Sequence, residues 1–309
     1  MEKYKERILN ILDIIRAYDK TSNTVIVGPS GRNKFHFRVY ANGGFILRIP
    51  VYPQGKFEAL EEEYVKELKY LTTKDEEDKL DAIRKIINEN TLTKGLDYFE
   101  EGENKNLKEY LSLAVKATNE KFVQRKNNDE NLKNIRERNW QTEIIKDKIK
   151  TEYKQKEILI FDMEFQTKKS ENQRGEIGKP DFIGFDGDRF YLIELKTNTE
   201  ACTGDSGLAA HEGDMKKING YKAGKKSLIA EFLHRIKLLQ DFNLIDQSWN
   251  QAIKNFDKEG KDNLDYLFLF LINGEYTKEK FKGKIENEHV NSEKVLFLKK
   301  QNNRFLYER

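Results

Sequence analysis

The sequence predicts a mixed α/β fold, with an α-β-β-β-α-β order of elements in the C-terminal half and a smaller α+β domain before it. Two kinds of apolar pattern predict it, because some segments repeat at helical spacing and others have the period of two of β-strands. Two of the strand-like runs are also joined by an Asp-Gly turn of the kind that closes β-hairpins. Because hairpin strands pair antiparallel and helical crossovers allow parallel pairing, the order predicts one mixed sheet flanked by helices.

The N-terminal part begins with a predicted helix over residues 4–18, where Ile8, Ile11, Leu12 and Ile15 share one face. Three strands and three helices are expected after it, the strands at 24–27, 34–40 and 45–49 and the helices at 57–71, 76–90 and 107–124. The polar residues 125–129 then indicate a boundary. It separates an N-terminal recognition or regulatory domain, residues 1–126, from a second domain, residues 127–309.

The second domain is predicted to begin with a long charged helix over residues 130–153. The next elements are a strand, a loop, the two strands of a hairpin, two helices and a strand, at 157–166, 167–179, 180–186, 189–196, 206–222, 226–246 and 264–272. A short helix and two strands complete the chain, at 277–282, 294–299 and 303–307.

Composition excludes several classes of protein. Charged residues make up 35% of the chain, yet the formal net charge is only +3, so affinity for nucleic acid must come from local patches. Cys202 is the only cysteine, which excludes an internal disulfide and fits a reducing compartment; we interpret it as an incidental loop residue. The longest apolar run, residues 267–272, is far too short to span a bilayer. We therefore expect a cytoplasmic protein with no membrane partner.

The most informative segment is the predicted hairpin around Asp186-Gly187-Asp188. A turn at Gly187-Asp188 would pair residues whose numbers sum to 375 and set Asp181 directly opposite Glu194. A turn at Asp186-Gly187 would shift the pairing by two residues and leave the two carboxylates as diagonal neighbours. Because alternate strand residues share a face, both registers place Asp181, Glu194 and Lys196 on the same side of the sheet.

Two carboxylates and a lysine on one face of a sheet predict a metal site. Carboxylate oxygens are the hard ligands that Mg²⁺ prefers, and Mg²⁺ shares its remaining positions with water and substrate phosphates. Such a metal polarises a phosphodiester and generates hydroxide from bound water. Lys196 could orient that water, help to deprotonate it, or offset charge on the phosphorane. The alternative is a surface hairpin whose acids pair with Lys179 or Lys196.

Residues 130–272 resemble the PD-(D/E)xK nuclease superfamily, whose members share a restriction-endonuclease-like fold. The resemblance is carried by Pro180-Asp181, by Glu194-Leu195-Lys196 at a strand end, and by the order of elements around them. It implies hydrolysis of phosphodiester bonds that depends on Mg²⁺ or Mn²⁺. In that reading Asp181 and Glu194 are metal ligands, and Lys196 lies beside the attacking water.

Members of this superfamily often carry a further acid upstream of the hairpin. The resemblance implies Glu164 as this accessory metal ligand, on the preceding strand. Asp162 has the same parity on that strand, and Glu143 lies on the preceding helix, so both remain contenders. The choice among the three leaves the number of metal ions open.

The segment after the hairpin has the pattern ELK…SGLxxHxxD, which is similar to a subset of uncharacterised bacterial proteins of the superfamily. Ser206 is predicted to cap the following helix, whose N-terminal N–H groups would suit a phosphate. His211, on the second turn, could contact phosphate or donate a proton to the leaving oxygen. Alternatively, His211 is paired with Asp214 on the helix surface.

The same helix is predicted to bind nucleic acid. Related nucleases often carry a Gln-xxx-Tyr pair there, and here Lys217 and Tyr221 have that spacing, with lysine in place of glutamine. No acid lies between residues 215 and 230, whereas the same segment contains five lysines, of which Lys216 and Lys217 are the first. Together with Lys179 and Ser206 these residues are candidate phosphate contacts, which would make binding strongly salt-dependent. A solvated helix face is the alternative.

These patterns favour a metal-dependent nuclease. Because most proteins of this resemblance act on DNA, DNA is favoured as substrate over RNA, which nothing in the residues excludes. A nuclease with its own sensor domain would suit bacterial defence, restriction or repair. One alternative is a nucleic-acid-binding or scaffold protein that keeps the fold without catalysis. Another is an effector that an activator or partner switches on through residues 1–126; homo-oligomerisation also stays open.

Overall fold

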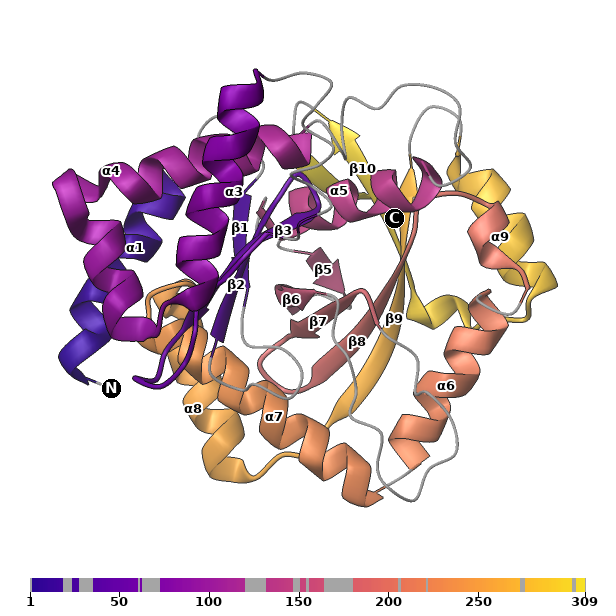
Figure 1. Cartoon of the computed structure of the whole chain (residues 1–309). Coiled ribbons are helices and arrows are strands. Elements are labelled where there is room, and N and C mark those ends of the chain that lie inside the picture. Colours follow the sequence, from indigo (N-terminus) through magenta and orange to yellow (C-terminus); the bar gives the residue numbers. More distant parts are fainter. Residues whose placement is uncertain are drawn as a thin grey trace. The chain divides into compact units, whose positions relative to one another are not determined.

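The structure of this protein is a computed structural model (Figure 1). It describes residues 2–18, 24–27, 36–60, 62, 73–119, 132–146, 151–153, 156–163, 180–204, 207–220, 222–272, 276–301 and 304–308. The chain divides into two compact units, Met1–Lys146 and Asp147–Arg309. Helix α5 (Leu132–Lys146) therefore belongs to the first unit, whereas the expected boundary at 126/127 would group it with the second.

The first unit is built on a four-stranded antiparallel sheet in the order β1-β2-β3-β4. Its strands are Thr24–Val27, His36–Ala41, Gly44–Pro50 and Glu58–Ala59. Helices α1 (Glu2–Tyr18), α3 (Lys74–Glu89) and α4 (Leu92–Asn119) pack on this sheet and on one another, and α5 contacts β1. The apolar stripe predicted for the first helix is confirmed, because Ile8, Ile11, Leu12 and Ile15 are fully buried.

One predicted helix of this unit is corrected, and another is part of a longer element. The helix expected over 57–71 is wrong at its start, because Glu58 and Ala59 form β4 against Arg48 and Leu47; residues 61 and 63–71 lie outside the described residues. The helix expected over 107–124 is confirmed as far as Asn119, as the second half of α4, and residues 120–124 lie outside the described residues. That element begins at Leu92 and is interrupted by non-helical backbone between Glu101 and Asn104.

The second unit contains a seven-stranded mixed sheet in the order β11-β10-β9-β8-β7-β6-β5. Its strands, from β5 to β11, are Thr151–Tyr153, Lys156–Met163, Phe182–Phe185, Phe190–Lys196, Leu264–Ile272, Val295–Gln301 and Arg304–Glu308. Strands β8, β9 and β10 are parallel and the remaining neighbours are antiparallel. The sheet curls so that its edge strands β5 and β11 contact each other. The predicted mixed α/β architecture is therefore confirmed.

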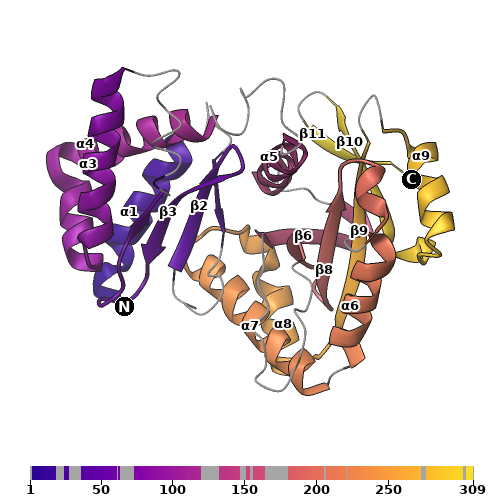
Figure 2. The ribbon, with the colours of Figure 1, turned by 45° about the vertical axis from the view of Figure 1, so that its right-hand side comes forward.

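Helices connect the parallel strands of this sheet. Helices α6 (Leu208–Gly220), α7 (Lys222–Asp241) and α8 (Asn250–Glu259) lie between β8 and β9, and α9 (Lys278–Asn287) lies between β9 and β10. Figures 1 and 2 show α6 running beside β9, which it contacts. The helix predicted to reach residue 153 is corrected, because residues 151–153 pair with β6 as strand β5.

An aromatic cluster fixes α7 and α8 on one face of the sheet. Phe190 of β8 lies 5.6 Å from Phe232 of α7 and 5.0 Å from Phe256 of α8, measured between ring centroids. Phe185 of β7 lies 4.8 Å from Phe190. Because Phe190 and Glu194 are separated by an even number of strand positions, the cluster marks the face on which Glu194 also lies.

Within the described parts of the chain, no helix has the length and the apolar character needed to cross a membrane.

Candidate active site on the β7–β8 hairpin

The turn of the hairpin sets its register. The backbone N–H of Asp186 donates to the carbonyl of Arg189, and Gly187 takes a φ of +93°, which favours glycine. The Asp186 carboxylate accepts the N–H groups of Asp188 and Arg189, both at 2.8 Å. The strand pairs run from Phe185↔Phe190 to Phe182↔Ile193, so the first of the two predicted registers is confirmed.

Asp181 immediately precedes β7, one position beyond the pair formed by Phe182 and Ile193. This position sets it opposite Glu194. Its Oδ2 accepts the backbone N–H of Leu195 at 2.7 Å. The hydrogen bond ties the Asp181 carboxylate to the end of β8, beside the residues with which it is predicted to act.

The two carboxylate oxygens of Glu194 have different surroundings. Glu194 is 5% exposed, and its Oε1 lies 3.0 Å from Nζ of Lys196 and 2.9 Å from Nε2 of His211. Its Oε2 is buried and accepts no hydrogen bond from any residue that the structure describes. A buried acceptor left without a hydrogen-bond partner lowers the free energy of unfolding by about 1–3 kcal/mol. A bound cation at this oxygen would offset that cost.

Lys196 ends β8 and is itself only 4% exposed. It lies on the same face as Glu194, as strand parity predicts. A buried ammonium is costly unless it is paired, and the Glu194 carboxylate provides that pair. The structure thus brings Asp181, Glu194 and Lys196 to one end of the hairpin.

His211 reaches this end from the first turns of α6. The imidazole Nε2 lies against Glu194, which differs from the alternative in which His211 pairs with Asp214. Asp214 instead accepts a hydrogen bond from Lys217 at 3.1 Å. His211 therefore contacts a predicted metal ligand, and its roles toward phosphate or a leaving oxygen stay predictions.

The three contenders for the accessory metal ligand lie in different places. Glu164 is outside the described residues. Glu143 lies on α5 of the first unit and accepts a hydrogen bond from Asn139 at 3.2 Å. Asp162 is fully buried on β6 and forms an ion pair with Arg235 of α7.

Arg235 is a residue that sequence reasoning missed. It is 1% exposed and links Asp162 to Glu231, whose Oε1 lies 2.6 Å from its Nη2. Only the spacing of four residues between Glu231 and Arg235 is visible as a helical pattern in the sequence. The Asp162 carboxylate is thus occupied by an interior ion pair.

The predicted nucleic-acid contacts are only partly described. Lys179, Ser206 and Tyr221 lie outside the described residues. Lys216 pairs with Glu212 at 2.9 Å, and Lys217 is highly exposed and pairs with Asp214. An exposed ion pair such as that of Lys217 with Asp214 contributes only about 0–1 kcal/mol, so a phosphate could displace Asp214.

Among the residues that the structure places, no group of three or more His, Cys, Asp or Glu side chains could hold a metal ion. The hairpin provides two carboxylates, one of which has a buried oxygen without a partner. This donor set fits a hard divalent cation that keeps several waters. The third predicted ligand, Glu164, belongs to the part of the chain that is not described.

Glu212 attaches α6 to the sheet beside the site. Its Oε1 accepts the Tyr266 hydroxyl of β9 at 2.6 Å, and its Oε2 lies 2.9 Å from Nζ of Lys216. Burial opposes ionisation of this carboxyl, but the hydrogen bonds from Tyr266 and Lys216 outweigh it, so its pKa lies below the ordinary value. Sequence reasoning missed this contact, which joins residues far apart in the chain.

We expect Glu212→Gln to lower the free energy of unfolding at neutral pH by about 1.5–3 kcal/mol, as for hydrogen bonds to a charged group. Because the folded-state pKa of Glu212 is depressed, its contribution is complete above the ordinary pKa of 4.5 and is lost as pH falls through the folded-state pKa. Urea unfolding from pH 7 to pH 3 measures this. The exposed Glu286→Gln on α9 is the control; an equal loss of stability at every pH would contradict the prediction.

The interpretation of Cys202 as an incidental loop residue is corrected. Cys202 ends a short 3₁₀ helix, Glu200–Cys202, after β8, and its side chain is fully buried. Burial raises the pKa of its thiol to about 11. The thiol is therefore protonated at neutral pH and is poorly suited to nucleophilic chemistry.

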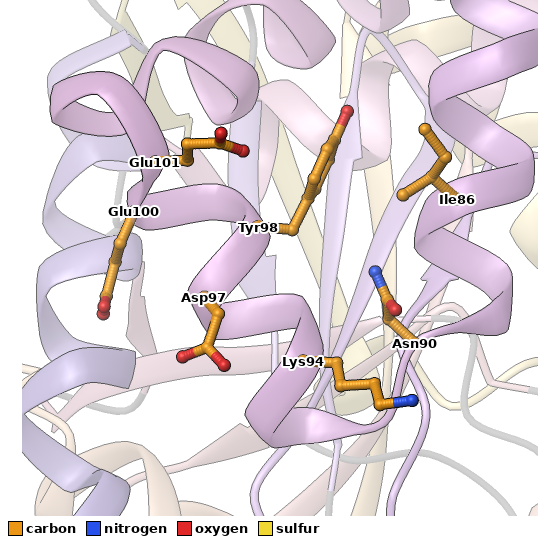
Figure 3. Close-up of a pocket in the computed structure, with 7 residues that line it drawn as sticks. All are labelled: Ile86, Asn90, Lys94, Asp97, Tyr98, Glu100 and Glu101. Carbon is orange, nitrogen blue, oxygen red and sulfur yellow. The ribbon is translucent and has the colours of Figure 1, made fainter.

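The first unit contains an open hollow of about 710 Å³ between α3 and α4 (Figure 3). It is lined by residues of both helices and the turn between them, namely Ile86, Asn90, Lys94, Asp97, Tyr98, Glu100 and Glu101. Asp97 and Glu100 both pair with Arg7, at 2.7 Å each. The hollow is thus a mixed surface whose acids are in part neutralised, and nothing in it resembles the hairpin constellation.

Comparisons of the chain with protein-family models, with curated proteins and with solved structures give no significant match. The function of the hairpin therefore has to be argued from its own residues.

Proposed function

We propose that this protein is a metal-dependent nuclease whose active site is the open end of the β7–β8 hairpin, and that its second unit has a restriction-endonuclease-like core. The observation that carries the proposal is the buried Oε2 of Glu194, which has no hydrogen-bond partner among the described residues and lies next to Lys196 and opposite Asp181. The succession of β6, β7, β8, α6 and β9 supports it, because this is the order that the resemblance implies.

Asp181 and Glu194 are the residues that hold the cation. When bound, a divalent cation would polarise the scissile phosphate and lower the pKa of a water molecule bound to it. Lys196, kept in place by Oε1 of Glu194, orients the attacking water and offsets negative charge on the phosphorane. The Leu195 N–H group holds the Asp181 carboxylate at the strand end.

DNA is the proposed substrate, and the exposed lysines of α6 are the proposed phosphate contacts. Lys216 and Lys217 follow His211 on the same helix by five and six residues, so a backbone bound at the hairpin could continue along α6. Neutralising phosphates with these lysines would make binding weaken steeply as salt concentration rises.

The test incubates the purified chain with labelled linear duplex, circular duplex and single-stranded DNA and with RNA, each with Mg²⁺, Mn²⁺ or EDTA. We expect cleavage of DNA that requires the cation and stops in EDTA. Intact substrates under every metal condition would overturn the proposal. Binding that persists in EDTA without cleavage would favour a non-catalytic nucleic-acid-binding protein.

A further inference from the structure

The Glu194 carboxylate is held by one oxygen only. Its Oε1 has two nitrogen neighbours, Nζ of Lys196 at 3.0 Å and Nε2 of His211 at 2.9 Å. Its Oε2 has no described partner. Nε2 of His211 is thus within hydrogen-bond distance of Oε1. Since a carboxylate accepts hydrogen bonds and does not donate them, a form of the imidazole with a proton on Nε2 is the one that would donate to it.

We infer that His211 is a positioning residue, which together with Lys196 locks the Glu194 carboxylate so that Oε2 alone faces the cation. The inference rests on the proposed function, since it concerns the same metal ligand. With only Lys196 on Oε1, the carboxylate could rotate about its terminal bond, a torsion with broad minima. A second donor from another element removes that freedom.

Gly207 is what allows α6 to bring His211 to Glu194. A Cβ at Gly207 would lie 2.7 Å from the carbonyl carbon of Thr203 and 2.8 Å from the carbonyl oxygen of Cys202, which is closer than side-chain carbons approach a backbone. The Gly207 N–H donates to Gly204, and the His211 N–H donates to Gly207, at 2.9 and 3.1 Å. The start of the helix is thus seated on the backbone that follows β8.

Glu212 holds the same helix from another side. It adjoins His211 in sequence, and its hydrogen bond to Tyr266 attaches this turn of α6 to β9. Since the turn is held by the Gly207 contact at its start and by Tyr266 on its flank, its rotation is restricted. The imidazole is therefore delivered to Oε1 by two independent contacts.

The chain offers a matched control on the same helix. A Cβ added at Gly213 would meet no atom of the described residues within 4 Å, apart from its own helix backbone and chain neighbours. An alanine there is expected to stabilise the helix slightly and to leave the site undisturbed. Gly207→Ala and Gly213→Ala therefore make the same chemical change with opposite expected consequences.

The experiment measures the Kd for Mn²⁺ by calorimetry, the single-turnover rate of DNA cleavage and the melting temperature of the full chain. We expect His211→Ala and Gly207→Ala to weaken Mn²⁺ binding by about 10–100-fold, as for other residues that orient a metal ligand. His211→Gln should recover most of the affinity, because its amide can donate to Oε1. Gly213→Ala should bind Mn²⁺ as wild type does.

Wild-type Mn²⁺ affinity in His211→Ala would overturn the inference while leaving the proposed nuclease intact. The inference would also be overturned if His211→Gln had the wild-type melting temperature but bound Mn²⁺ no better than His211→Ala. A wild-type chain that neither binds Mn²⁺ nor cleaves DNA would instead overturn the proposed function itself.

Discussion

Replacing Lys196 with alanine is expected to slow metal-dependent DNA cleavage by about 10²–10³-fold, the usual contribution of one preorganised group that stabilises charge in the transition state. The side chain is 4% exposed and its ammonium donates to the Glu194 carboxylate, so it lies against a predicted metal ligand and not in solvent. The measurement is the single-turnover rate constant at saturating Mg²⁺, with the melting temperature recorded for each variant.

Lys237→Ala is the control for Lys196→Ala. Lys237 lies on α7, is 40% exposed and pairs with Asp257 on the surface. The variant should therefore cleave DNA at the wild-type rate. Lys196→Met retains most of the aliphatic side chain without the charge, and it should be as slow as Lys196→Ala. Wild-type cleavage by Lys196→Met would contradict a role for the ammonium.

Asp162→Ala is expected to cause the largest loss of stability of any single change discussed, about 3–5 kcal/mol, because it leaves the buried guanidinium of Arg235 with only the less buried Glu231 carboxylate. For a unit of this size that corresponds to a fall in melting temperature of roughly 6–20 °C. Urea unfolding measures the free energy of unfolding directly. Asp257→Ala, which breaks only the surface pair with Lys237, should cost no more than about 1 kcal/mol.

Asp162→Ala and a double variant together decide whether Asp162 is a structural residue or a metal ligand. Asp162→Leu combined with Arg235→Met removes both charges of the buried pair and leaves only Glu231, which is partly exposed. It should therefore recover part of the lost stability, as replacement of buried ion pairs by apolar residues often does. Cleavage at a near-wild-type rate by this double variant would support a structural role. A stable Asp162→Ala that loses metal-dependent cleavage would show that Asp162 is the accessory ligand.

The hairpin could be predicted from sequence because its information is local. The turn residues restrict the register to two choices, and strand parity then places Asp181, Glu194 and Lys196 on one face in either of them. The structure has the register with the turn at Gly187-Asp188.

The errors have a shared physical cause, which is tertiary pairing that overrides local pattern. Residues 58–59 belong to an apolar and acidic stretch with helical spacing, yet they pair with β3. Residues 151–153 follow a long helical pattern in the sequence, yet they form strand β5 and pair with the adjacent strand β6. Neither partner can be read from the segment itself.

The contacts that complete the site were also beyond sequence reasoning. The ion pair between Asp162 and Arg235 spans 73 residues, and the contact of His211 with Glu194 depends on how α6 is seated. The difference between Oε1 and Oε2 of Glu194 arises only when β8 and α6 are both in place.

The Mg²⁺ dependence of DNA cleavage by wild type and by Glu194→Gln tests the metal-dependent nuclease most directly. Glutamine keeps the shape of the side chain but replaces a carboxylate oxygen by an amide, so it removes the charge that holds the cation. We expect wild-type cleavage to rise and saturate with Mg²⁺, and Glu194→Gln to stay at least about a hundredfold slower at every concentration. Glu286→Gln should behave as wild type. A Glu194→Gln variant that reaches the wild-type rate at high Mg²⁺, or a wild type that cleaves equally well in EDTA, would contradict the metal-dependent mechanism.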